Sequence, residues 1–164
     1  MNAFRREMVE LLPRLRRFAR VLAREPADAD DLVQLTVERA LARSAQWAIG
    51  TRLDSWMFRI MKNAWIDEVR ARKRRDVVFA PEEAGERVGD DGAAVVERRL
   101  EAAEVERELA RLPEDQRLAV ALVLVEGLSY REAAEVLEIP MGTLTSRLVR
   151  GRNAVLMRLA EGAA

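Results

Sequence analysis

Hydrophobic residues recur at steps of three and four through most of the chain, the spacing that gathers them on one face of an α-helix. This pattern predicts a first helix over residues 4–22, in which Pro13 marks a kink or a restart. It predicts a second helix over residues 26–47 and, after a loop at Gly50, a third over residues 54–69. Strand-like alternation is scarce, so the expected fold is all-α.

The helical pattern stops near Asp76. Residues 80–94 hold Pro81, three glycines and many acids with almost nothing to bury, which predicts a flexible linker. Helices resume over residues 96–109 and again over 113–127. The chain is therefore expected to form two small helical domains, residues 1–75 and 96–164, joined by an acidic linker over residues 76–95.

Composition narrows the possible chemistry. Hydrophobic residues make up 49% of the 164 residues and aromatic residues only 5%, which suits short amphipathic helices better than a sheet. Cysteine and histidine are absent, which excludes disulfides, Cys/His zinc sites and catalysis by thiolate or imidazole. The sequence has neither a leader peptide nor an apolar run of bilayer length, so we expect a soluble, cytoplasmic protein without membrane insertion, metal or cofactor.

The formal net charge is zero, but the charges are strongly segregated. Residues 59–75 contain seven basic side chains against two acids, and residues 76–108 contain eleven acids against four arginines. Residues 141–158 contain four arginines and no acid. Two basic blocks on either side of an acidic one indicate nucleic-acid contacts better than the sum of charges does.

A helix-turn-helix is predicted over residues 128–159. Ser129 and Glu132 have the spacing of a capping box, and a short helix of small apolar residues follows. Residues 138–140 form the turn, and a longer helix begins near Met141, with Gly151 allowing a close approach. This arrangement is typical of proteins that read the major groove, although an αα-hairpin with a solvated arginine face is the alternative.

The longer helix supplies the candidate DNA contacts. Its apolar stripe leaves hydroxyl and arginine side chains on other faces, namely Thr143, Thr145, Ser146, Arg147, Arg150 and Arg152. We expect Ser146 and Arg147 to reach base edges, and Arg150 and Arg152 to hold phosphates.

The third helix carries a second candidate. Trp56, Arg59, Asn63 and Arg70 share one face, where an aromatic ring and an amide beside arginines could stack on and hydrogen-bond an unpaired base. The alternative is a core Trp56 and a solvated Asn63, which these residues alone favour.

Five motifs occur in order along the chain: residues 28–34 (DADDLVQ), residues 56–63 (WMFRIMKN) with Asp67 and Arg70, residues 112–114 (LPE), residues 126–130 (EGLSY), and residues 140–143 (PMGT) with Ser146 and Arg147. Together they resemble a bacterial sigma factor of the extracytoplasmic-function class. The resemblance spans nearly the whole chain except the linker.

This resemblance implies two helical domains, region 2 and region 4, and a role as a subunit of RNA polymerase that reads the −10 and −35 promoter elements without bond chemistry of its own. In this family one segment of region 2 binds the clamp helices of the polymerase β′ subunit. The residues that match it here are Asp30, Asp31, Leu32, Val33 and Gln34. These residues suggest an apolar patch rimmed by acids, with simple capping of the helix by the aspartates as the alternative. Region 4 is expected to bind the β flap.

The same resemblance places Asn63 where a flipped base of the −10 element is recognised. It also implies that the basic end of the third helix, which includes Arg70, Arg74 and Arg75, contacts the DNA backbone nearby. The linker would run toward the RNA exit path, and the last helix would read the −35 element. An anti-sigma factor covering both domains is a further expected partner.

Some positions differ from the family pattern. Leu35 stands where glutamate is common and Trp47 where phenylalanine is common, and Thr145 replaces a frequent basic residue of the recognition helix. Residues 11–18 are similar to the general stress response branch of alphaproteobacteria.

Two other functions fit parts of the sequence. A free-standing helix-turn-helix regulator would be a dimer on palindromic half-sites. A nucleic-acid enzyme would need an acidic metal site from Asp28, Asp30 and Asp31.

Overall fold

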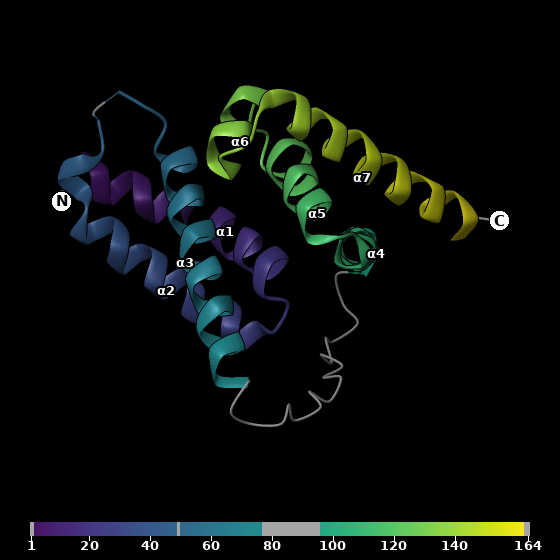
Figure 1. Cartoon of the computed structure of the whole chain (residues 1–164), viewed down its shortest axis with the longest axis horizontal. Helices are drawn as coiled ribbons and strands as arrows, with labels where there is room; N and C mark the ends of the chain where they lie inside the picture. The colour runs from purple at the N-terminus through teal and green to yellow at the C-terminus, as the bar shows by residue number, and fades with distance from the viewer. Residues whose placement is uncertain (1, 49, 77–95, 163–164) are drawn as a thin grey trace.

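The computed structural model describes residues 2–48, 50–76 and 96–162, and over those ranges the chain is helical without strands (Figure 1). An N-terminal unit contains α1 (Ala3–Ala23), α2 (Pro26–Ala42), a 3-10 turn (Ser44–Gln46) and α3 (Leu53–Asp76). A C-terminal unit contains α4 (Val96–Arg111), α5 (Glu114–Val120), a π-helical turn (Ala121–Val125), α6 (Tyr130–Leu137) and α7 (Met141–Gly162). Apart from Asp76, the expected linker lies outside the described residues.

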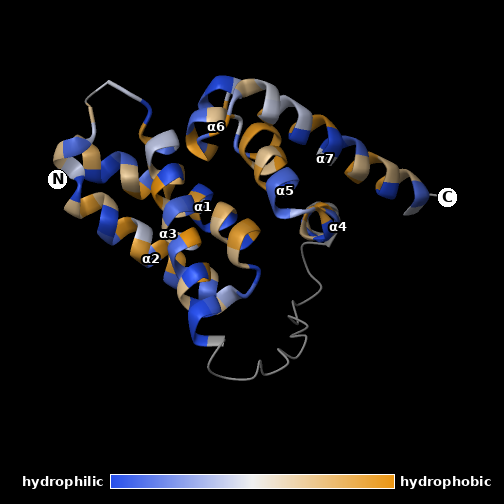
Figure 2. Ribbon diagram, viewed as in Figure 1, coloured by the Kyte–Doolittle hydropathy of each residue, from blue (hydrophilic) through white to orange (hydrophobic). Residues whose placement is uncertain are grey.

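The all-α prediction and the two helical units are confirmed. Hydrophobic and hydrophilic positions alternate along α2, α3 and α7, as amphipathic packing requires (Figure 2). In the part of the chain that the structure describes, no helix is both long and apolar enough to cross a bilayer.

The N-terminal unit packs α1, α2 and α3 against one another around two phenylalanines. Phe18 and Phe58 are fully buried, and their rings meet edge to face with centroids 5.1 Å apart. Leu15 and Met57 extend this core on the same two helices. The core holds α3 in place and leaves the opposite side of that helix available for other contacts.

One sequence-based helix boundary was wrong. At Pro13, only the alternative of a restart is excluded, because α1 continues through the proline, and Leu15 and Phe18 extend its buried face beyond it. The second helix ends at Ala42 rather than near residue 47, since residues 43–46 are exposed and have nothing to bury. Trp47 instead reaches the core from a non-helical segment, with its ring 5.6 Å from that of Phe4.

The C-terminal unit contains the predicted helix-turn-helix. The Ser129 hydroxyl accepts the Glu132 amide at 3.1 Å, and the Glu132 carboxylate accepts the Ser129 amide at 3.0 Å, so the capping box is confirmed. Glu138 ends α6 in the left-handed conformation (φ 57°), a position where glycine is common. Leu144 and Leu148 of α7 are buried beneath α6 and α5.

Gly151 lets α7 cross α5 at close range. A Cβ at this position would lie 2.7 Å from Cγ2 of Val120 and 3.3 Å from Gln116, whereas a Cβ on Gly142 of the same helix would meet nothing within 4 Å. The two units also touch each other, since α6 lies beside α3 and α5 beside α1 (Figure 1).

We predict that Gly151→Ala destabilises the C-terminal unit by about 1–3 kcal/mol, although alanine is the better helix former. The β-branched Val120 cannot easily rotate away within its own helix. Urea denaturation followed by circular dichroism measures the effect. Gly142→Ala is the matched control and should not destabilise, and Val120→Ala should recover part of the loss in the double variant. A Gly151→Ala chain as stable as its parent would show that the crossing is loose.

Candidate nucleic-acid interface

The predicted face of α3 is present, but its four residues differ in exposure. Arg59 and Arg70 are exposed, whereas Trp56 and Asn63 are half-buried. The Trp56 ring packs edge-on against Phe4 with centroids 6.1 Å apart. Trp56 is therefore partly a core residue, as the alternative interpretation of the sequence predicted. It also lies at the edge of the face of α3 that carries Arg59.

The C-terminal end of α3 presents cations. Arg70, Arg74 and Arg75 are exposed, and Arg75 approaches the Glu68 carboxylate at 3.4 Å. Arg72 is used differently, because it donates two hydrogen bonds to Asp28 of α2 at 2.7 and 3.0 Å. These bonds hold the pKa of Asp28 below its usual value. Arg72 thus ties α3 to α2.

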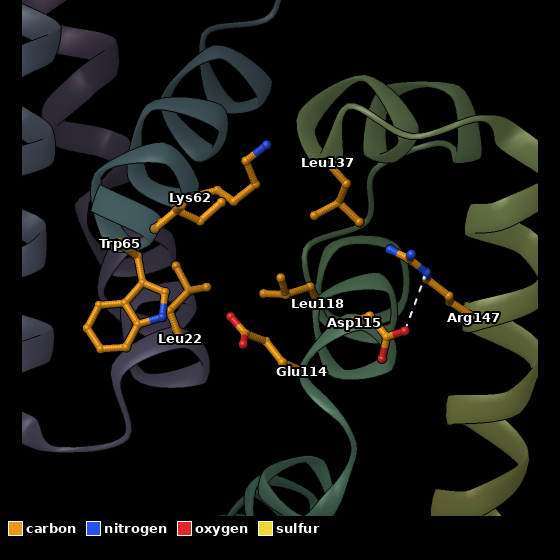
Figure 3. A pocket seen from close by; sticks show the side chains of 9 residues that line it. Leu22, Lys62, Trp65, Glu114, Asp115, Leu118, Leu137 and Arg147 are labelled. Atoms are coloured by element: carbon orange, nitrogen blue, oxygen red, sulfur yellow. Dashed lines mark ion pairs between the residues drawn. The ribbon is translucent and has the colours of Figure 1, made fainter. Parts of the chain in front are cut away.

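On α7, Ser146, Arg150 and Arg152 are exposed and Thr143 is half-buried. The Thr145 hydroxyl donates to the carbonyl of Met141 at 2.9 Å, so its proton is used within the helix. Arg147 is one-third exposed and forms an ion pair with Asp115 of α5 at 3.5 Å (Figure 3). The arginine expected to reach bases is therefore paired inside its own unit.

On α2, the expected polymerase-binding segment is only partly a surface. Asp30, Asp31 and Gln34 are exposed, but Leu32 and Val33 are 4% and 8% exposed and belong to the core. The expectation of an apolar surface patch at these two residues is wrong, because they pack inward beneath the acids.

The structure also bears on the two alternative roles of the aspartates at the start of α2, which are capping of the helix and binding of a metal ion. The N-cap of α2 is Glu25, and no side chain caps the helix through a hydrogen bond. Asp28 is held by Arg72. Among the described residues no group of three or more acids is arranged to hold a metal ion.

The contact between the two units centres on Glu126. Its carboxylate is 1% exposed and accepts hydrogen bonds from Arg14 at 3.2 Å and from Arg17 at 2.6 and 2.9 Å, both on α1. Arg14 also donates to the Glu126 carbonyl at 2.7 Å. The hydrogen bond to Glu126 raises the pKa of Arg17. A buried carboxylate with charged donors on both oxygens satisfies the requirement for pairing.

A second ion-pair group lies at the start of α3. Arg52 donates to Asp54 at 2.7 and 3.1 Å and pairs with Glu132 of α6 at 2.7 Å, and Arg14 reaches Asp54 at 3.0 Å. Burial opposes ionisation of Asp54, but the hydrogen bonds from Arg52, from the Ser55 amide and from Arg14 outweigh it and lower the pKa of Asp54.

A third group lies one to two turns further along α3. Arg59 hydrogen-bonds the carboxylate of Glu138, and the Lys62 ammonium lies 3.7 Å from the same group. The hydrogen bond from Arg59 lowers the pKa of Glu138. Burial lowers the pKa of Lys62, although Glu138 partly opposes this. Arg59, a candidate DNA contact, is therefore occupied by a carboxylate of the other unit.

A groove of about 420 Å³ separates the units next to these ion pairs (Figure 3). Leu22, Leu118 and Leu137 supply apolar walls, and Lys62 and Glu114 place opposite charges along it. Its apolar walls, flanked by charges of both signs, suit the side chains of an amphipathic segment of another protein.

Apart from Arg59, the residues of the interdomain contact were not among the candidate site residues predicted from the sequence. The acids Glu126, Glu132 and Glu138 are spaced six residues apart and come from a stretch otherwise read as DNA-binding. The presence of acids within a segment interpreted as DNA-binding was the one sequence signal for this contact. Their partners lie about 80 or more positions away in the sequence, and helical periodicity says nothing about pairs that far apart.

Two family models match the chain. The first, the Sigma2 domain of PhyR, matches residues 8–62, and the second, Sigma-70 region 4, matches residues 102–155. The chain is 35% identical over 152 residues to the ECF RNA polymerase sigma factor EcfG of Rhodopseudomonas palustris, covering 93% of this chain and 82% of that protein. It is 37% identical over 145 residues to the ECF RNA polymerase sigma factor SigM of Mycobacterium tuberculosis, covering 88% and 70%.

Solved structures show the same arrangement of helices. The sigma factor RpoE in complex with the anti-sigma factor NepR from Bartonella quintana superposes with a TM-score of 0.80 at 29% identity, covering 98% of both chains. CnrH in complex with the cytosolic domain of CnrY gives a TM-score of 0.70 at 26% identity, covering 97% of this chain and 88% of that one.

We predict that acid weakens the fold from about pH 4 downward. The pKa values of Asp54 and Glu138 are lower in the folded chain than the ordinary values near 4, so the stability they contribute is present above pH 4 and lost as pH falls through the folded values. Urea midpoints between pH 7 and pH 2.5 measure this loss. Asp54→Asn should lower stability at pH 7 by about 1–3 kcal/mol and flatten the acid dependence. Equal acid slopes for parent and variant would contradict the assignment.

Proposed function

The chain belongs to the extracytoplasmic-function (ECF) RNA polymerase sigma factors, and on that premise we propose which of its surfaces performs each part of promoter recognition. Its function is to bind RNA polymerase, direct it to specific promoters and promote initiation of transcription. The supporting observation is that two exposed, arginine-bearing helix faces, on α3 and α7, lie in two separate units of one chain.

The proposed boundaries are residues 1–75 for region 2, 76–95 for the linker and 96–164 for region 4. Region 2 then contains α1 to α3 and region 4 contains α4 to α7. Such a chain supplies sequence choice and captures the opened strand, and polymerase supplies the bond chemistry. Because polymerase and the chromosome share one compartment in bacteria, the proposed site of action is the cytoplasm.

In region 2, Asn63 is proposed to recognise a flipped base of the −10 element. It lies half-buried on the face of α3 that also carries Trp56 and Arg59, so an amide, an aromatic edge and a cation converge there. Unstacking a base costs a few kcal/mol, and a site that repays this cost can be selective. Arg70, Arg74 and Arg75 follow on the same helix as contacts to the DNA backbone.

In region 4, α7 is proposed to read the −35 element in the major groove. Ser146 and Arg147 are the candidates for base edges, while Arg150 and Arg152 are the candidates for phosphates. Arg147 has to leave Asp115 to reach DNA, which makes its exchange of partners part of binding. With Thr143 and Thr145 half-buried, the exposed arginines dominate this surface.

Core polymerase is proposed to bind α2 through its exposed polar face. Asp30, Asp31 and Gln34 are accessible, and a hollow of about 120 Å³ beside them is lined by Asp31, Leu35 and Glu68. Leu35, in place of the more common glutamate, adds an apolar wall to this hollow. The β′ clamp helices are the proposed partner here, and the β flap is the proposed partner of region 4.

An anti-sigma factor is the third proposed partner. One solved neighbour, RpoE, is bound to the anti-sigma factor NepR, and another, CnrH, is bound to the cytosolic domain of CnrY. The groove between the units, with its leucines and its Lys62 and Glu114 charges, offers a helix of such a partner both apolar and ionic contacts. The finer placement in the general stress response branch is proposed from residues 11–18, which lie within the match of residues 8–62 to the Sigma2 domain of PhyR.

We expect Asn63→Ala to reduce run-off transcription from a cognate promoter by about tenfold or more, because a good pair of hydrogen bonds to a base contributes about 1–3 kcal/mol. The assay uses the full chain with bacterial core polymerase on genomic fragments. Binding to core, measured by co-migration in size exclusion, should be unchanged.

Asn153→Ala makes the same chemical change at an exposed position of α7 and serves as the control. Unaltered transcription with Asn63→Ala would remove Asn63 from the −10 assignment. Absence of any transcript from the parent chain with core polymerase would overturn the proposed function itself.

A further inference from the structure

We propose that α1 carries a further nucleic-acid contact, a ridge of Arg16, Arg20 and Arg24 that holds phosphates of the promoter backbone. This inference rests on the proposed function, since it needs the chain to hold promoter DNA together with polymerase. The ridge touches no bases, so it raises the affinity for every promoter alike and leaves sequence choice to α3 and α7.

The C-terminal half of α1 is rich in arginine. Residues 14–24 contain five arginines and no acid, whereas residues 5–10 of the same helix contain two arginines and two glutamates. Leu15, Phe18 and Leu22 take up the buried face of this half, so the arginines gather on its other sides. The zero net charge of the chain therefore conceals a third basic segment, in addition to those of α3 and α7.

Three of these arginines follow one another along the helix. Arg16, Arg20 and Arg24 are four residues apart, and all three are exposed. Residues at this spacing are neighbours on a helix surface and lie about 6 Å apart along its axis. One DNA strand carries a phosphate about every 3.4 Å of duplex axis, so two nucleotides span nearly the same distance. The ridge can therefore follow the backbone of one strand.

The ridge lacks carboxylate partners, unlike the side of α1 next to it. Arg14 and Arg17 pair with a buried carboxylate of the C-terminal unit. Within residues 2–48, 50–76 and 96–162, by contrast, Arg16 and Arg20 are in no ion pair. The two arginines of α7 that are proposed to hold phosphates have the same property. Exposed arginines that no acid neutralises keep their full charge for a phosphate.

A buried guanidinium beside the ridge is a separate observation in favour of an anion at this place. Arg117 of α5 is 5% exposed, and its Nε and Nη1 atoms are enclosed without a hydrogen-bond partner. Burial lowers the pKa of Arg117, and the positive charge of Arg24 lowers it further. Arg24 also donates to the carbonyl of Ala110 at 2.7 Å, so it is held at the end of α4, just before α5. A phosphate at Arg24 would supply the negative charge that these two cations lack.

The alternative is that these arginines only stabilise the C-terminal end of α1 through the helix dipole. Arg20 lies in the last turn and can act in this way. Arg16 lies before the last turn, where the dipole has little effect. Arg16 therefore distinguishes a phosphate contact from a purely structural role.

The test measures how the affinity of the assembled holoenzyme for DNA depends on salt. The chain is combined with bacterial core polymerase, and the probe is a fluorescein-labelled promoter fragment identified by run-off transcription on genomic fragments. Each phosphate contact contributes about 0.9 to the slope of log affinity against log salt, which corresponds to about eightfold in affinity at 0.1 M relative to 1 M salt. We expect Arg16→Gln and Arg20→Gln each to lower the slope by about 0.9 and the affinity at about 0.1 M salt by five- to tenfold.

The same relative loss is expected on a fragment with a scrambled −10 element, because backbone contacts carry no sequence information. Arg16→Lys should keep the slope of the parent, since the point charge of lysine also binds phosphate. Arg5→Gln is the matched control. It removes the same charge from an exposed position of the same helix, at the end where acids balance the arginines.

A slope for Arg16→Gln equal to that of the Arg5→Gln control would overturn the ridge as a DNA contact. Weaker binding of either ridge variant to core polymerase in size exclusion would also overturn it, because the arginines would then face polymerase. Transcription by the parent chain is measured in parallel. An unchanged slope with normal transcription defeats the ridge alone, whereas absence of transcription from the parent defeats the function on which it rests.

Discussion

The relative placement of the two units depends on one buried carboxylate, that of Glu126. Taking a carboxylate out of water costs several kcal/mol unless charged donors meet it, and here Arg14 and Arg17 of the other unit supply them. Arg14 then reaches Asp54, and Arg52 links Asp54 to Glu132. The charge at Glu126 is therefore satisfied only when α1 lies against the C-terminal unit, and the ion pairs of Asp54, Arg52 and Glu132 then hold α6 beside α3.

This network also reduces the positive charge that a chain of zero net charge can present to DNA. Many of its cations already have carboxylate partners in this arrangement of the two units, and one of them, Arg59, lies on the helix face proposed for the −10 element. A protein that displaces few counterions binds free DNA weakly. Polymerase can supply the missing affinity by holding the two units apart at the spacing of the two promoter elements, so sequence choice becomes available only in the complex.

Helices and caps were predictable from the sequence because their determinants are local. The capping box at Ser129 and the buried stripe of α7 follow from spacings of three and four residues, and both are present. Burial of Leu32 and Val33 could not be foreseen, because an amphipathic pattern does not say which face another helix covers. The partners of Glu126 lie more than 100 positions away, and the continuation of α1 through Pro13 depends on tertiary packing that overrides the local penalty.

A footprint on a genomic promoter fragment is the most direct measurement of the central claim, that this chain reads two separate elements as part of polymerase. With core polymerase and the chain together, we expect two protected patches about two helical turns apart and permanganate-reactive bases near the downstream patch, whereas the chain alone should protect neither. Protection of a palindromic site by the chain alone, without polymerase, would contradict the claim and indicate a free-standing regulator instead.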